Sequence, residues 1–303
     1  MELPDRISLR EVGPRDGLQN EDPVPTDAKV ALIDSLAKTG VQRIEAVSYV
    51  RPQAIPQMAD ADEVWKRTVK REEIRYSALV PNLKGAVRAL DSGFTELEAV
   101  VSASETHNRK NVNRSTGQSL DEIAEIIALA HARGATVQVI VSTAWGCPYE
   151  GDVPVQRVVN VASRAVSDGA DSSSFGDTTG MATPTRVQRL VGAFRDANPE
   201  QSLNLHFHNT RGTGLANVLA ALELGVADFD ASVGGLGGCP YAPGATGNIA
   251  TEELVHMVED MGVATGVNLD AMIEAAREAE RIVGRTLPSQ VLRAGPRSRT
   301  ISA

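Results

Sequence analysis

Short runs rich in valine, isoleucine and alanine recur along the chain, and segments with helical periodicity lie between them. Such an alternation is typical of a parallel sheet whose strands are joined by crossover helices. The predicted strands cover residues 7–13, 43–48, 75–80, 96–104, 136–142, 171–177, 203–209 and 229–235. Eight strands, each followed by a helix, predict an α/β protein built as a (β/α)8 TIM barrel.

The barrel accounts for most of the chain as one domain. We expect the barrel at about 7–265 and a C-terminal helical extension at about 266–303, with an additional helix at 269–284. The alternative is an open doubly wound sheet, which often carries G-x-G-x-x-G after its first strand. No such string follows the first predicted strand, so the barrel is favoured.

Three helix starts carry recognisable signals. We expect Thr26 and Ser119 to act as N-caps, because their hydroxyls can accept a hydrogen bond from the first turn. Thr183 and Pro184 mark another start, since proline is favoured in the first turn. Gly40 suits the left-handed residue that ends a helix.

The composition excludes several classes of protein. Hydrophobic residues make up 42% and charged residues 23%, as in ordinary folded domains. The apolar runs are far shorter than the ~20 residues of a membrane span, and the N-terminus shows no signal segment. We therefore expect a cytoplasmic protein without a membrane partner. The formal net charge of -9 argues against nucleic acid, which is bound by clustered lysine and arginine, and favours a small-molecule ligand.

Both cysteines, Cys147 and Cys239, lie in the string Gly-Cys-Pro-Tyr. Two cysteines do not make a disulfide framework, and neither belongs to a C-x-x-C pair. The flanking residues differ, so the two strings are not an internal repeat.

Unusual polar residues cluster at the predicted C-terminal ends of the strands, where barrel enzymes build their active sites. They are Arg15, Asp16, Glu45, Ser48, Asp177, His206, His208, Cys239 and Asn248. His206 and His208 are two residues apart on one strand and therefore point to the same side. Barrel closure brings the first, second, seventh and eighth strands together.

Two imidazoles with a carboxylate and an amide oxygen suit a divalent metal, Mg2+ or Mn2+, without a thiolate. Each histidine taken alone has another interpretation, a hydrogen-bonded core residue, and Arg15 with Asp16 has one as a structural ion pair. An amidohydrolase would carry its H-x-H pair on the first strand instead of the seventh. The other histidines, His107, His131 and His256, are expected on loop or helix surfaces.

The segment at 108–114 is basic, although the chain as a whole has a negative net charge, and it contains Arg109, Lys110 and Arg114. It is either a solvated loop or an anion-binding segment.

Several longer strings are specific enough for comparison with known families. They are EVGPRDGLQNE at 11–21, IEAVSYV at 44–50, WGCPYEG, FGDTTG, HFHNTRG and GLGGCPYAPGATGN at 235–248. Together they resemble the 3-hydroxy-3-methylglutaryl-CoA lyases of the DRE-TIM metallolyase superfamily, over about 7–269. The resemblance implies a metal-dependent barrel that cleaves 3-hydroxy-3-methylglutaryl-CoA to acetyl-CoA and acetoacetate, in leucine catabolism and ketone body metabolism. It also implies a homodimer.

The resemblance assigns roles residue by residue. It implies Asp16, His206, His208 and Asn248 as metal ligands. Arg15 would hold the thioester enolate oxygen, Glu45 would support it, and Cys239 would take part in proton transfer from a glycine-rich loop. Cys147 is expected to pack near the pocket. Further candidates for contacts with the acyl-CoA substrate are Gln19, Ser48, Asp177, Arg211, Arg109, Lys110 and Arg114.

The string after the seventh strand departs from the H-x-H-D-T-Y-G-Q that most of these lyases carry, at Asn209, Arg211 and Thr213. An arginine near the metal can pair with a repositioned substrate carboxylate, so a citramalyl-CoA lyase is an alternative. A Claisen-type synthase of the superfamily is a second, although such synthases carry a long C-terminal region that we do not find here. A non-catalytic acyl-CoA binding protein is the non-enzyme alternative.

Overall fold

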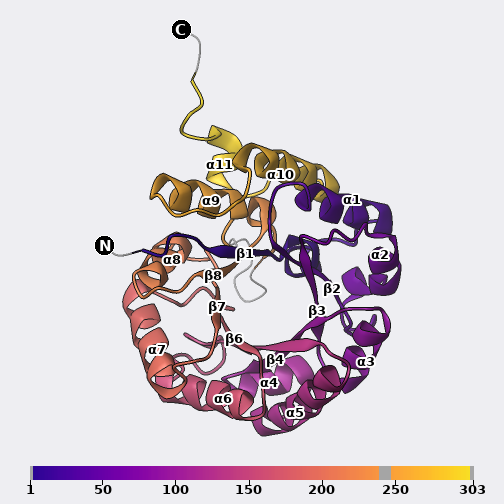
Figure 1. Cartoon of the computed structure of the whole chain (residues 1–303), viewed down its shortest axis with the longest axis vertical. Coiled ribbons are helices and arrows are strands. Elements are labelled where there is room, and N and C mark those ends of the chain that lie inside the picture. The colour runs from indigo at the N-terminus through magenta and orange to yellow at the C-terminus, as the bar shows by residue number, and fades with distance from the viewer. Residues whose placement is uncertain (1–2, 239–246, 301–303) are drawn as a thin grey trace.

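The computed structural model describes residues 3–238 and 247–300. Parallel strands pair in chain order, and the first pairs with the last, so the sheet closes into a barrel (Figure 1). The strands are β1 (Ser8–Glu11), β2 (Arg43–Ser48), β3 (Arg75–Val80), β4 (Glu96–Ser102), β5 (Thr136–Ser142), β6 (Ser172–Gly176), β7 (Leu203–His206) and β8 (Asp228–Ala231). Each lies within or overlaps a predicted strand, and the predicted (β/α)8 fold is confirmed.

Helices surround the barrel as an outer ring, and the last two lie outside that ring. They are α1 (Thr26–Leu36), α2 (Ala61–Arg67), α3 (Leu83–Asp91), α4 (Glu105–Val112), α5 (Thr116–Ala132), α6 (Val155–Ser167), α7 (Pro184–Ala197), α8 (Gly214–Leu222), α9 (Thr251–Asp260), α10 (Leu269–Val283) and α11 (Gln290–Ala294). Buried apolar side chains of most of these helices form one continuous core with those of the strands. Within the described residues, no helix is both long and apolar enough to cross a membrane.

Several predicted strands are too long at their C-terminal ends. β1 stops at Glu11 because the Val12 carbonyl accepts hydrogen bonds from the backbone amides of Asp16 and Gly17, which closes a tight turn, η1 (Gly13–Gly17). β8 likewise gives way to the short turn η3 (Val233–Gly235). β7 ends at His206, and His208 forms an isolated bridge with Asn248. Arg15, Asp16 and His208 thus lie just beyond the strands.

Two of the predicted helix caps are wrong. Ser115, and not Ser119, caps α5 in a capping box with Gln118, while Ser119 is buried and accepts a hydrogen bond from Asn108. Thr26 is the first residue of α1, and its hydroxyl donates to Asp60 instead of capping the helix. The start of α7 after Thr183 and the positive φ of 88° at Gly40 agree with the sequence.

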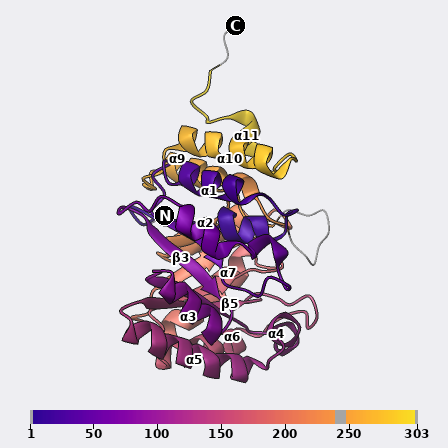
Figure 2. The same cartoon turned by 90° about the vertical axis from the view of Figure 1, so that its right-hand side faces the viewer.

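The C-terminal helices lie outside the barrel ring, beside α1 and α9 (Figure 2). α10 occupies the predicted position, and α11 follows it. α10 packs on α1 and on the turn η3, and α11 packs on α9. The additional helices therefore contact the mouth of the barrel next to β8.

Candidate active site

The turn η1 carries two of the predicted site residues to the barrel mouth. Its first residue is Gly13, and a Cβ there would lie 2.8 Å from the Oε1 atom of Glu11. Glycine is therefore required where the chain leaves β1. The tight turn places Arg15 and Asp16 above the C-terminal end of the barrel, where both line the cavity.

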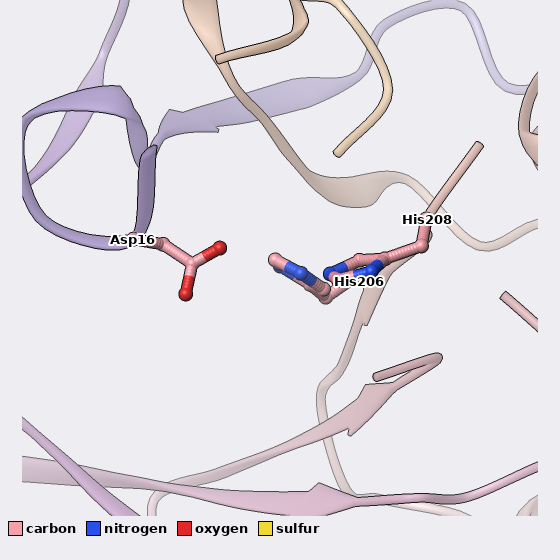
Figure 3. Close-up of side chains that lie close together, drawn as sticks. All are labelled: Asp16, His206 and His208. Carbon is pink, nitrogen blue, oxygen red and sulfur yellow. The ribbon is translucent and has the colours of Figure 1, made fainter. Parts of the chain in front are cut away.

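Asp16, His206 and His208 converge at this mouth. Each offers one ligand atom, and these atoms all lie within 4.8 Å of one another. Figure 3 shows the Asp16 carboxylate pointing toward the two imidazole rings. Three side chains from the first and seventh βα units thus form one cluster.

Asn248 completes the group. Its bridge with His208 fixes its backbone, and its Nδ2 donates to Asp16 Oδ2 at 2.8 Å and to the Leu236 carbonyl at 3.1 Å. The Oδ1 atom of Asn248 is buried and accepts no hydrogen bond from the described residues. An unpaired buried amide oxygen is costly unless another partner satisfies it. A cation beside Asp16 would be such a partner.

The protonation states of Asp16 and His208 also fit a cation. Burial lowers the pKa of His208 to about 3, which leaves its ring neutral. Burial opposes ionisation of Asp16, but Arg15, the two imidazoles and the hydrogen bond from Asn248 together outweigh burial and lower the pKa to about 2. Metals bind deprotonated carboxylates and neutral imidazoles. These residues therefore fit a divalent cation, with the oxygen and nitrogen donors that Mg2+ or Mn2+ accepts.

Arg15 lies between this cluster and a buried acid. Its Nη1 is 2.8 Å from Asp16 Oδ1, and its Nη2 is 2.7 Å from Glu45 Oε2. Burial raises the pKa of Glu45 well above its ordinary value, while the charge of Arg15 opposes this rise. Glu45 is fully buried on β2 and orients the guanidinium from behind. One face of Arg15 is thereby directed into the cavity.

The cavity has a volume of about 660 Å3. Its floor contains Arg15, Asp16, His206 and His208, and Gln19 lines the wall, with its Oε1 3.5 Å from Arg15. A cavity of this size with a few converging polar side chains suits a small-molecule ligand.

The outer wall of the cavity comes partly from α4, a segment whose basic part was predicted to be either a solvated loop or an anion-binding segment. Arg114, in the connection that follows α4, lines the cavity and also pairs with Glu122. Arg109 is exposed and pairs with Glu105 at 2.7 Å, and the Lys110 ammonium lies 5.0 Å from the Tyr149 ring.

His107 corrects the expectation of a surface histidine. It lies on α4, is 3% exposed and lines the cavity. The signal for this was the Ser104 cap directly after β4, because residues of the first turn after a barrel strand face the mouth.

Other predicted residues lie near the mouth without lining the cavity. Ser48 is buried, and its hydroxyl is 3.5 Å from the Leu79 carbonyl. Asp177 accepts hydrogen bonds from the amides of Met181 and Ala182, and burial raises its pKa to about 6.

Arg211 is likewise held by the loop after β6. It donates to the carbonyls of Thr179 at 2.6 Å and Gly180 at 3.0 Å, so in this structure its guanidinium is directed at backbone and not at the cavity.

Cys147 is buried, as expected, and its thiol donates to the Ser104 hydroxyl at 2.9 Å. Cys239 lies outside the described residues.

The family model described as HMGL-like matches residues 6–278. The chain belongs to the HMGL-like family. The hydroxymethylglutaryl-CoA lyase YngG of Bacillus subtilis is 44% identical over 293 residues, which are 96% of this chain and 98% of that protein. The (R)-citramalyl-CoA lyase of Chloroflexus aurantiacus is 42% identical and covers 96% of this chain and 95% of its own.

A solved member of the HMGL-like family has the same fold. It is described as an HMG-CoA lyase from Acinetobacter baumannii in complex with coenzyme A and 3-methylmalate. It superposes with a TM-score of 0.94 at 44% identity and covers 99% of this chain and 98% of that chain. The family expected from the sequence strings is therefore confirmed.

Proposed function

We propose that this protein cleaves 3-hydroxy-3-methylglutaryl-CoA into acetyl-CoA and acetoacetate with the help of a divalent cation, Mg2+ or Mn2+. The observation that carries the proposal is the convergence of Asp16, His206 and His208 beside Arg15 on the floor of one cavity. Full-length identity of 44% to a hydroxymethylglutaryl-CoA lyase supports the substrate.

The site would hold the cation through Asp16, His206, His208 and Asn248. When bound, the cation supplies a Lewis acid for the substrate hydroxyl. The reaction removes the hydroxyl proton at C3, breaks the bond between C2 and C3, and moves that electron pair into the thioester to form an enolate. The enolate then takes a proton at C2 and becomes acetyl-CoA.

Arg15 is the residue that can balance the charge of this enolate. Its guanidinium lines the cavity and is already oriented by Glu45 at 2.7 Å, so it needs little reorganisation during the reaction. Because Glu45 and Asp16 are nearby, the pKa of Arg15 is raised above its ordinary value despite the opposing effect of burial, and the side chain stays charged. Cys239 remains the residue that the resemblance implies in proton transfer.

One observation supports the alternative function, that of a citramalyl-CoA lyase. The relative of that name is 42% identical over nearly the full length of both chains. The same bond cleavage in citramalyl-CoA would release acetyl-CoA and pyruvate, so the two substrates are told apart by their second product.

We further propose a cytoplasmic homodimer, which the family resemblance suggests.

The test uses purified protein freed of metal by a chelator, with Mg2+ or Mn2+ added back. Mass spectrometry is expected to detect acetyl-CoA and acetoacetate only after a cation is restored. Arg15→Gln should lower kcat by about 10²–10³-fold, the usual effect of removing a group that stabilises an oxyanion. Arg75→Gln, a control at the opposite end of the barrel, should retain wild-type kcat.

Failure of folded, cation-bound protein to cleave 3-hydroxy-3-methylglutaryl-CoA would refute the proposal. Release of pyruvate from citramalyl-CoA in the same experiment would then identify the alternative substrate.

A further inference from the structure

A buried row of charged side chains runs inside the barrel, behind the proposed metal site. Arg10 on β1 and Asp230 on β8 are partners in the strand register, and their exposed fractions are 1% and 3%. Arg10 donates from Nε to Asp230 Oδ1 at 2.8 Å and from Nη2 to Oδ2 at 2.7 Å. This two-point contact sets both the position and the plane of the carboxylate.

Arg10 is itself held from the far side. Its Nη1 lies 2.7 Å from Gln138 Oε1 and 2.6 Å from Glu98 Oε1. Glu98 is 1% exposed and also accepts a hydrogen bond from Ser77. The guanidinium therefore has partners on both sides, as a charge inside a barrel requires.

The same carboxylate contacts the metal cluster. Asp230 Oδ2 lies 3.1 Å from Nδ1 of His206, and Asn204 on β7 donates to Asp230 Oδ1 at 3.0 Å. An ionised carboxylate only accepts hydrogen bonds, so Nδ1 of His206 must carry the proton. In the neutral ring, Nε2 is then the nitrogen with a lone pair, available to a cation in the cluster formed with Asp16 and His208.

We propose that Asp230, held by Arg10 and Asn204, is a positioning residue that sets the ring orientation and tautomer of His206. The inference rests on the proposed metal site and concerns the residues behind it. Register places these groups together: Asp230 pairs with Arg10 on one side and with His206 on the other. A carboxylate behind a metal-binding histidine typically contributes 10–100-fold, as an order-of-magnitude range, to metal affinity.

The first experiment measures Mn2+ affinity by electron paramagnetic resonance of free Mn2+, without any assay of activity. Asp230→Asn should weaken Mn2+ binding by about 10–100-fold, because an amide N–H would face Arg10 or His206. The matched control is Asp228→Asn, two residues earlier on β8, where the carboxylate is 40% exposed and lies 3.4 Å from Arg43. Equal Mn2+ affinities of the two variants would overturn the inference.

A second variant covers the case in which Asp230→Asn does not fold. Arg10→Lys keeps the charge but cannot contact both oxygens of Asp230, so its loss of Mn2+ affinity should be smaller, about 3–10-fold. Thermal unfolding of each variant shows whether the fold is retained. Wild-type affinity in folded Arg10→Lys would count against the role of Arg10.

Nitrogen-15 NMR of the His206 ring in the metal-free protein gives an independent readout. The wild-type ring should be protonated at Nδ1, and Asp230→Asn or Arg10→Lys should shift it toward the Nε2 tautomer. If wild-type protein binds no Mn2+, the proposed metal site fails, whereas an Nε2-protonated wild-type ring would refute this inference alone.

Discussion

At the scale of single residues, two buried carboxylates join the turns that carry the site. Glu11 Oε1 accepts hydrogen bonds from the amides of Gly13 and Val233, both at 2.8 Å, and its Oε2 accepts one from the Thr251 hydroxyl at 2.6 Å. Glu252 accepts from the Gly234 amide at 3.0 Å. The turn after β1, the turn after β8 and the start of α9 are thereby tied together.

The pKa of Glu252 predicts a specific dependence of stability on pH. Burial, with a smaller effect of Glu253, raises this pKa from 4.5 to about 7 in the folded protein. The folded state therefore holds a proton that the unfolded state has released, so this contribution to the unfolding free energy is lost as the pH rises from about 4.5 to 7. By linkage the loss is on the order of 3 kcal/mol. Glu252→Gln removes this titration.

The measurement is urea unfolding of wild type and Glu252→Gln between pH 5 and pH 8. The variant should gain stability relative to wild type as the pH rises, because only wild type loses the contribution of Glu252. Burial also raises the pKa of Glu11 to about 7, but Glu11 titrates in both proteins, so its effect on the difference largely cancels. Glu72→Gln, which changes an exposed carboxylate, is the control. A pH-independent difference between wild type and Glu252→Gln would contradict the assigned pKa.

At the scale of elements, the corner between α4 and α5 shapes the outer wall of the cavity. Asn113 ends α4 with a left-handed φ of 56°, and Ser115 begins α5 with a capping box. Asn108 stabilises the corner by donating to the Arg114 carbonyl at 3.0 Å and by accepting from the Ser102 amide at 2.9 Å. These contacts explain how a polar segment that resembles a loop forms a helix.

Ser115→Ala tests this corner. The Ser115 hydroxyl accepts from the Gln118 amide at 3.1 Å, and its loss should lower the unfolding free energy by about 1 kcal/mol. Urea unfolding is the measurement, and Ser167→Ala at the exposed end of α6 is the control. Equal stability of the two variants would mean that the capping box does not stabilise α5.

At the scale of the whole molecule, the C-terminal segment packs on the barrel mouth. Leu287 is fully buried against Gly234 in η3, and the Ser289 amide donates to the Gly234 carbonyl at 3.3 Å. Two residues after Gly234 lies Leu236, whose carbonyl accepts a hydrogen bond from Asn248 at 3.1 Å. The C-terminal helices thus support a turn that is connected to the proposed metal site.

Gly234→Ala measures this contact. The residue has a φ of 66°, and a Cβ would lie 2.3 Å from Leu287 Cδ1. Gly284→Ala is the matched control, because its φ of 68° imposes the same strain while no atom lies within 4 Å of the Cβ. Overpacking should make Gly234→Ala about 1–3 kcal/mol less stable than Gly284→Ala in urea unfolding.

The double variant Gly234→Ala with Leu287→Ala removes the clash as well as the packing. Its loss of unfolding free energy should be smaller than the sum of the losses in the two single variants, because the residues are in contact. Additive losses would show that the Leu287 side chain does not restrict this turn.

The sequence alone predicted the strand positions, the barrel and the common side that His206 and His208 share. Local information is sufficient there, because apolar runs specify buried strands and residues two apart on a strand share a side. The specific strings also identified the family. Helix caps were less predictable, since Ser115 and Ser119 have the same hydroxyl and only the backbone path decides which of them is the cap.

Only the tertiary structure decided which polar groups meet. Arg10 and Asp230 are separated by 220 residues and become partners through the register between β1 and β8. His107 enters the cavity wall because α4 folds back over the mouth, whereas Arg211 is drawn to the carbonyls after β6. The physical reason is that closure of the barrel and the geometry of its loops set the long-range contacts, and these set burial, charge and hydrogen bonding at the site.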